Sequence, residues 1–164
     1  MRKIIVVILL LAAMAGCTSI DCPVQNLVYT NYMLMKPDGT ADTLGVDTMW
    51  IWSQRADGTD TLLVSSLCGS SATSFSLPIS YTQPEDVICT MVADTTGTIW
   101  LDTIRILKEN YPHFESVDCQ AAYFHKITAV SNTRRIIDSV VINKPDVNYD
   151  ATTEHFYLYL KARR

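Results

Sequence analysis

Hydrophobic and polar residues alternate along most of this chain, in short segments separated by turn residues. The segment 154–160 shows the pattern most clearly, because Phe156, Leu158 and Leu160 fall on one face and Tyr157 and Tyr159 on the other. A period of two predicts a half-buried strand. Comparable segments lie at residues 26–35, 48–54, 61–65, 74–80, 86–93, 98–107, 122–130 and 136–143.

Turn residues divide these segments at spacings of roughly 8–15 residues, as expected for an all-β domain. Residues 94–97 (Asp-Thr-Thr-Gly) lie between two apolar segments and form the best hairpin candidate. Pro78 predicts an edge or a strand end, because proline cannot donate a ladder hydrogen bond. No segment carries a 3.6-residue apolar stripe. We therefore predict one antiparallel, immunoglobulin-like β-sandwich over residues 26–164, with a small barrel as the main alternative.

The first residues differ from the rest of the chain. Arg2 and Lys3 precede an uncharged apolar run over 4–13, and small residues lead directly to Cys17. This order predicts a lipoprotein signal peptide over residues 1–16, because the run is too short to span a bilayer. Cys17 would then carry diacylglycerol and a further acyl chain at the start of a short tether, 17–25. An ordinary signal peptide cleaved nearby is the alternative.

The charge of the exported part argues against nucleic acid as a partner. Removing residues 1–16 takes away Arg2 and Lys3, which leaves 11 of the 13 basic side chains against 17 acidic ones, a formal net charge of −6. Basic residues cluster only at 134–135 and 161–164. Phosphate backbones need grouped Lys and Arg, so we expect no nucleic-acid binding.

Four cysteines follow the lipidation site: Cys22, Cys68, Cys89 and Cys119. An even number in an exported chain predicts disulfides, and four cysteines allow three pairings. We expect Cys22 with Cys119, which ties the start of the domain to a later loop, and Cys68 with Cys89. A zinc site is the alternative, but the chain lacks the CxxC spacing that such sites usually show.

Several short motifs, together with the lipobox, follow one another in a familiar order: residues 42–44 (Asp-Thr-Leu), 46–48 (Val-Asp-Thr), 60–63 (Asp-Thr-Leu-Leu), 77–79 (Leu-Pro-Ile), 113–119 (His-Phe-Glu-Ser-Val-Asp-Cys) and 137–143 (Ile-Asp-Ser-Val-Val-Ile-Asn). The chain resembles a family of small Bacteroidales-type lipoproteins classed only as a domain of unknown function. The resemblance implies a cell-envelope lipoprotein and supplies no catalytic residue. Residues 50–53 (Trp-Ile-Trp-Ser) and Gln120 depart from the expected pattern.

No catalytic or metal-binding motif stands out. His113, His125 and His155 lie on separate segments, without HxH or HExxH spacing, and no GxSxG elbow is present. Aspartates gather in several turns, where Asp commonly hydrogen-bonds its own backbone; calcium binding by these turns is the alternative. We predict no enzyme activity, no cofactor and no metal.

Two aromatic pairs are candidate binding surfaces. Trp50 and Trp52 share one strand face, and Tyr157 and Tyr159 share another. We expect the tryptophans to face the core, with an exposed platform as the alternative, and the tyrosines to lie at the surface.

These observations predict a membrane-anchored, non-enzymatic binding or assembly module of the cell envelope. Its expected partners are the membrane, through the lipid, and another envelope protein or a glycan. The absence of an acidic run after Cys17 favours the periplasmic side of the outer membrane. The alternatives are a fimbrial-type subunit that assembles by strand exchange and a small envelope hydrolase.

Overall fold

The computed structural model describes residues 22, 27–55, 57–68 and 71–161, and this part of the chain consists of strands, turns and loops without a helix. The predicted signal peptide, the predicted lipidation site Cys17 and the predicted tether, apart from Cys22, lie outside the described residues. The strands are β1 (Tyr29–Met35), β2 (Thr48–Gln54), β3 (Asp60–Cys68), β4 (Ser74–Pro78), β5 (Glu85–Ala93), β6 (Ile99–His113), β7 (Ala122–Asn132), β8 (Ile137–Ile142), β9 (Asp146–Val147) and β10 (Phe156–Leu160).

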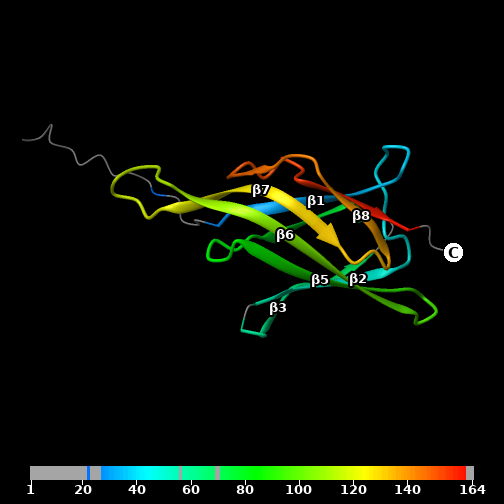
Figure 1. Cartoon of the computed structure of the whole chain (residues 1–164). Helices are drawn as coiled ribbons and strands as arrows, with labels where there is room; N and C mark the ends of the chain where they lie inside the picture. Colours follow the sequence, from blue (N-terminus) through cyan, green and yellow to red (C-terminus); the bar gives the residue numbers. More distant parts are fainter. Residues whose placement is uncertain (1–21, 23–26, 56, 69–70, 162–164) are drawn as a thin grey trace, which may run out of the picture.

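The strands form two sheets that pack face to face (Figure 1). The smaller sheet has the order β4-β1-β10-β8, and the larger has the order β3-β2-β5-β6-β7-β9. All pairings are antiparallel except that of β1 with β10, which run parallel. The predicted all-β sandwich is confirmed; the structure is compatible with an immunoglobulin-like topology, which stays a prediction.

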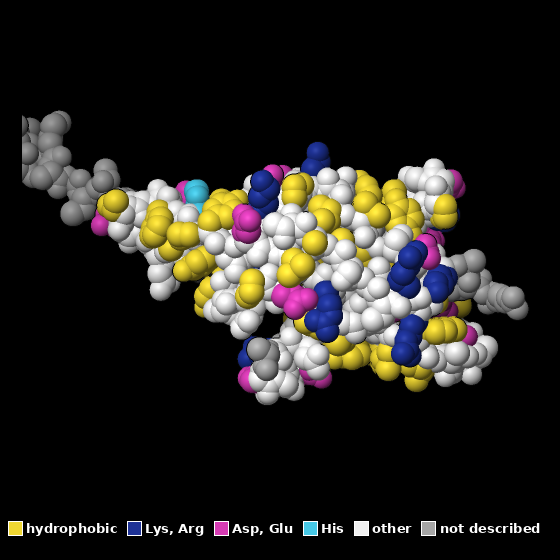
Figure 2. All heavy atoms as spheres, viewed as in Figure 1, with side chains coloured by type: hydrophobic (Ala, Val, Ile, Leu, Met, Phe, Trp, Pro, Cys, Tyr) yellow, Lys and Arg dark blue, Asp and Glu magenta, His cyan; other side chains and the backbone are white. Residues whose placement is uncertain are grey.

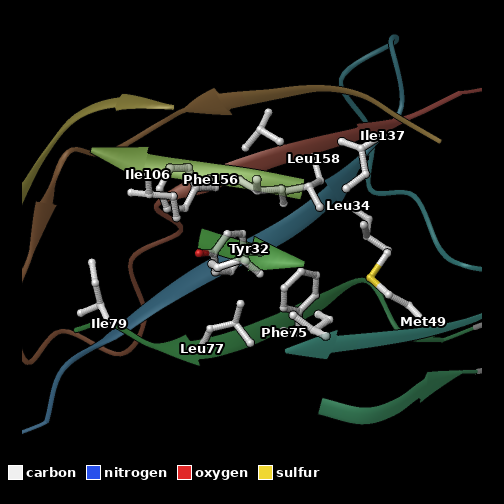
Figure 3. Close-up of a cluster of buried hydrophobic side chains, with 14 of the residues drawn as sticks. Tyr32, Leu34, Met49, Phe75, Leu77, Ile79, Ile106, Ile137, Phe156 and Leu158 are labelled. Atoms are coloured by element: carbon white, nitrogen blue, oxygen red, sulfur yellow. The ribbon is translucent and has the colours of Figure 1, made fainter. Parts of the chain in front are cut away.

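The inward faces of both sheets build one core, drawn in Figure 3. Tyr32 stacks between Phe75 and Phe156, with ring centroids 4.9 Å apart in each pair. Met49 and Ile51 close the core from the larger sheet and are 0% exposed. The alternation in β10 is also confirmed, because Phe156 and Leu158 are buried while Tyr157 and Tyr159 are half-buried on the other face.

The predicted segments match most strands to within a few residues. The hairpin at residues 94–97 joins β5 to β6, and Gly97 has a φ of 85°, which only glycine adopts without strain. Pro78 ends β4, which is an edge strand. The structure differs at β6, which extends to His113, and at β9, which the sequence pattern did not predict.

The disulfide predictions had mixed outcomes. Cys22 and Cys119 form a disulfide, as predicted. The predicted bridge between Cys68 and Cys89 is wrong, because Cys89 is a free thiol. Thr48 of β2 pairs with Cys68 on one side, whereas Trp52 pairs with Cys89 on the other. The two cysteines are thus separated by two strand spacings, roughly 10 Å, and by four positions along the strand, roughly 13 Å. A disulfide needs Cα atoms about 4.4–6.8 Å apart.

A buried carboxylate fixes the chain where it crosses between the sheets. Asp102 of β6 is 2% exposed and points into the sandwich. Its oxygens accept hydrogen bonds from Oγ1 of Thr133 at 2.5 Å and from the backbone N–H groups of residues 135, 136 and 137 at 2.8, 2.6 and 2.8 Å. These donors belong to the connection between β7 of the larger sheet and β8 of the smaller one. One side chain therefore satisfies the polar backbone of the crossover.

Four of the acidic turns share one local structure. In each, the threonine two positions after an aspartate donates hydrogen bonds from its backbone N–H and its hydroxyl to Oδ1 of that aspartate, which is Asp38, Asp57, Asp94 or Asp150. The hydrogen bond from the Thr40 hydroxyl lowers the pKa of Asp38, and the hydrogen bond from the Thr59 hydroxyl lowers that of Asp57. Gly39 and Gly58, which stand between the aspartate and the threonine in two of these turns, have positive φ values. These aspartates therefore stabilise their own turns.

Candidate functional site

The tryptophans of β2 lie on the outer face of the larger sheet. Met49 and Ile51 occupy the core, so Trp50 and Trp52 point the other way and are half-buried. The expectation that the tryptophans face the core is therefore wrong, because both lie half-buried on the outer face. Because side chains in a strand alternate, only one of the two sets could face inward, and the smaller Met and Ile side chains fill that space.

Cross-strand neighbours extend the tryptophan pair into a larger apolar surface. Trp50 lies opposite Met91 of β5, which in turn lies opposite Leu101 of β6. Trp52 lies opposite Leu62 of β3, and directly opposed side chains share one face of a sheet. Ile99 lies two residues before Leu101 on β6 and therefore on the same face of the sheet. We call this surface the apolar platform; its members are Trp50, Trp52, Leu62, Met91, Ile99 and Leu101.

The platform is open to solvent. Leu62, Ile99 and Leu101 are 61%, 58% and 50% exposed, respectively. Figure 2 shows hydrophobic side chains along the lower border of the molecule, beneath β2 and β5. Monomeric soluble proteins seldom leave large side chains of this kind contiguous and uncovered unless the surface has a partner.

Polar groups lie mainly at the margin of the platform. Thr103 follows Leu101 on β6, and Arg105 comes next on the same face, 3.4 Å from the carboxylate of Glu85. Cys89 lies between Trp52 and Thr103 in the strand register, as a half-buried free thiol. The surface therefore offers much apolar area and few hydrogen-bond donors or acceptors.

The structure does not bring the second aromatic pair to the same place. Tyr157 and Tyr159 lie on the outer face of the smaller sheet, on the opposite side of the sandwich from Trp50 and Trp52. Both tyrosines are half-buried, as expected for surface positions. Val141, the register neighbour of Tyr157, is 46% exposed. This face carries an apolar surface of its own, because the residues of β1 opposite the two tyrosines are methionines.

An open cleft of about 850 Å³ lies where the ends of β2, β4 and β5 meet. Its lining includes Asp57 of the acidic turn described above, together with the carboxylates of Glu85 and Asp86, neither of which the sequence indicated as a site residue. Glu85 pairs with Arg105, and Asp86 pairs at 3.0 Å with Lys108, whose side chain is 0% exposed. Burial raises the pKa of Asp86 despite the nearby lysine. Both carboxylates are thus engaged in ion pairs within the domain.

Lys108 also joins a buried polar network that includes His125. The lysine Nζ donates to the Gln83 carbonyl oxygen at 2.7 Å, and Asn110 donates to the same oxygen at 2.9 Å. Because the Asn110 amide nitrogen is a donor, its Oδ1 accepts from Nδ1 of His125, at 2.7 Å. His125 is 1% exposed. Burial, and secondarily the charge of Lys108, lowers the pKa of His125 from 6.5 to about 4.

The buried His125 predicts acid sensitivity between pH 6.5 and pH 4. Its folded-state pKa lies below the unfolded value, so protonation favours unfolding and stability falls as the pH drops through this window. The shift corresponds to about 3 kcal/mol of unfolding free energy. Denaturant titrations at pH 7 and pH 4 should show this loss, and His125→Gln should reduce it.

His113→Gln is the matched control, because that imidazole lies at the surface, 3.1 Å from Glu115. His155 retains part of the slope in both variants, because burial lowers the pKa of its imidazole as well. An unchanged slope in His125→Gln would contradict the assignment.

The histidines do not converge on a common site. His125 and His155 are buried, whereas His113 stacks on Phe124 with a centroid distance of 4.2 Å. Within the described ranges, no three His, Cys, Asp or Glu side chains are grouped to hold a metal ion. Nor does the described chain contain a helix long and apolar enough to cross a membrane.

Aromatic side chains gather again at the far end of the β6–β7 hairpin. Phe124 contacts the rings of Tyr111 and Tyr149 edge-on, at centroid distances of 6.3 and 5.0 Å. Phe114 and Val117, in the connecting loop, are 61% and 97% exposed. We call residues 111–124, with Tyr149 packed against them, the hairpin tip. Its rings come from three separate segments, so no local sequence pattern indicated this cluster.

Comparison with known proteins identifies a family but no characterised relative. Residues 48–160, which span β2 to β10, match a family described as a family of unknown function (DUF6452). No curated protein and no solved structure matches the chain. The matched segment includes the apolar platform and the hairpin tip and covers more than half of the sequence. The chain therefore belongs to this family of unknown function, DUF6452.

Proposed function

We propose that this protein is a lipid-anchored lipoprotein of the bacterial cell envelope, of the Bacteroidales type, which binds another envelope protein and catalyses no reaction. Cys17 would carry the lipid after removal of residues 1–16. The order of basic residues, apolar run and cysteine at the N-terminus supports this anchor. The domain would face the periplasm from the outer membrane.

The apolar platform is the observation that carries the proposed binding function. It combines two tryptophans with three aliphatic side chains that are at least 50% exposed. Tryptophan is enriched among the residues that dominate protein–protein binding energies, where neighbouring apolar contacts exclude water. A sheet face of this composition suits a protein partner with its own apolar patch.

A protein is favoured over a glycan because of the sparse polar groups on this face. Sugar rings stack on aromatic side chains, but their hydroxyl groups also need hydrogen-bond partners. The rows around Trp50 and Trp52 instead present Met91, Leu62 and Leu101. Most hydroxyl groups of a bound sugar would lose water there without gaining a partner.

Two other functions have less support. Assembly by strand exchange would require a strand to leave the sheet, and the last strand, β10, is already paired with both β1 and β8. Hydrolysis would require free acid–base groups, whereas Glu85 and Asp86 in the cleft are paired with Arg105 and Lys108.

Site-specific crosslinking in the native envelope tests the proposal. A photoreactive amino acid at Leu62 or Leu101 of the full chain should crosslink to one defined protein. The same group at Val141, which is 46% exposed on the opposite face, should not. Equal crosslinking from both faces would contradict docking through the platform.

A charge placed in the platform should then weaken binding of the crosslinked protein. Leu101→Asp is expected to lower the affinity about thirtyfold, because a loss of about 2 kcal/mol is typical of a central interface residue. Val141→Asp, at similar exposure, should leave the dissociation constant unchanged. Titration of the purified proteins measures both values, and equal affinities would argue against the platform.

A further inference from the structure

The hairpin tip lies at one extreme of the molecule. β6 is 15 residues long, so its two ends are about 50 Å apart. One end is the β5–β6 turn, and the other is the tip, at the far left of Figure 1. Figure 2 shows hydrophobic side chains gathered over this left end of the molecule.

The disulfide brings the start of the chain to the same end. Cys22 is bonded to Cys119, with Cα atoms 5.4 Å apart, and Cys119 belongs to the hairpin tip. Five Cα–Cα steps separate Cys17 from Cys22, and such a segment reaches at most about 18 Å. Without the disulfide, ten steps would separate Cys17 from Leu27, with a reach of about 35 Å. The bond therefore holds any lipid on Cys17 close to the tip.

The side chains of the tip match the chemistry of a bilayer interface. Val117 and Phe114 are apolar and strongly exposed, and Tyr111 and Tyr149 behind them are 41% and 38% exposed. Tyrosine is enriched at the level of lipid headgroups, where its ring is apolar and its hydroxyl stays wet. The acidic Glu115 and Asp118 lie in the same loop, so apolar insertion rather than attraction to anionic lipid would supply the affinity.

We propose that the hairpin tip inserts Phe114 and Val117 into the interface of the bilayer that holds the lipid anchor. This inference rests on the anchor at Cys17 put forward above. The contact would fix the orientation of the domain, with the tip at the membrane and the β5–β6 turn about 50 Å away along β6. The domain would then be held at two points, the lipid and the tip, instead of swinging on its tether.

Tryptophan quenching in liposomes tests this contact. The full chain, processed in its host and purified with its lipid, is reconstituted into zwitterionic phosphatidylcholine liposomes. One variant carries Val117→Trp and the matched control carries Thr95→Trp, at an exposed position of the β5–β6 turn. Acyl-chain-brominated phosphatidylcholine should quench the added emission of Val117→Trp at least twofold. The added emission of Thr95→Trp should stay unchanged, as should that of the native tryptophans.

The remaining outcomes distinguish a failure of the proposed tip contact from a failure of the proposed lipid anchor. Mass spectrometry of the mature N-terminus reports the diacylglyceryl adduct on Cys17 independently of quenching. If the adduct is present but Val117→Trp is quenched no more than Thr95→Trp, the tip contact is refuted and the anchor stands. If the mature protein carries no adduct, both proposals fail.

Discussion

Replacing Asp102 by alanine is expected to lower the free energy of unfolding by about 4 kcal/mol. The variant loses four hydrogen bonds to a charged acceptor and leaves three backbone N–H groups of the β7–β8 crossover without that partner. Buried donors without a partner are costly because they have given up water without replacement. Denaturant titration at pH 7 measures the loss.

Asp138→Ala is the matched control. Asp138 is half-exposed and makes one long ion pair, 3.5 Å from Arg134. Its removal should change the unfolding free energy by less than about 0.5 kcal/mol, as is usual for exposed pairs. If the two variants were equally stable, Asp102 would not organise the crossover.

The effect of Asp102 should also depend on pH. Burial alone would raise its pKa, but the hydrogen bonds from Thr133 and from the backbone of residues 135–137 outweigh that effect and hold it below the usual value. A carboxyl with a lowered folded-state pKa stabilises the protein above its unfolded-state pKa, near 4. The difference between wild type and Asp102→Ala should therefore shrink as the pH falls below about 4.

Removing the disulfide between Cys22 and Cys119 is expected to cost about 4 kcal/mol. The bond closes a loop with a sequence separation of 97 residues, and long loops restrict the unfolded chain most strongly. The double variant Cys22→Ser, Cys119→Ser should unfold at a correspondingly lower denaturant concentration. The m-value should rise, because the unfolded chain becomes less compact.

Cys89→Ser serves as the control, because this half-buried thiol is free and restrains no loop. Its unfolding free energy should stay within about 1 kcal/mol of wild type. A double variant as stable as Cys89→Ser would show that the disulfide contributes only local geometry.

The alternation of apolar residues was sufficient to predict most strands and the sandwich. It located β2 at its observed bounds and the inward face of β10, because both depend on local periodicity. It could not decide which face of β2 is buried. Met49 and Ile51 are as apolar as Trp50 and Trp52, so the choice depended on how much space the opposite sheet left.

The sequence pattern did not predict the polar residues that are buried inside the sandwich. Lys108 begins the unpredicted part of β6, and its buried side chain continues the inward alternation of Ile104 and Ile106. A charged residue there looked like the end of a strand. Asp102 was overlooked for a similar reason, because its donors lie more than 30 positions away in sequence. Only the assembled fold reveals such partners.

The cysteine predictions show the same limit. Cys22 and Cys119 could be paired from their positions at the start of the domain and in a later loop. Cys68 and Cys89 are close in sequence, yet they flank β2 at different heights. Their separation follows from the strand order and register of the larger sheet, which sequence spacing does not encode.

The parallel pairing of β1 with β10 has a consequence for how the chain folds. Tyr32 lies opposite Phe156, so the first strand needs the last one as its neighbour. Until the C-terminal residues are available, β1 can pair only with β4 and presents an open hydrogen-bonding edge. Contacts of such high sequence separation slow folding. We therefore expect folding of this domain to be slow and to be completed only when β10 joins the sheet.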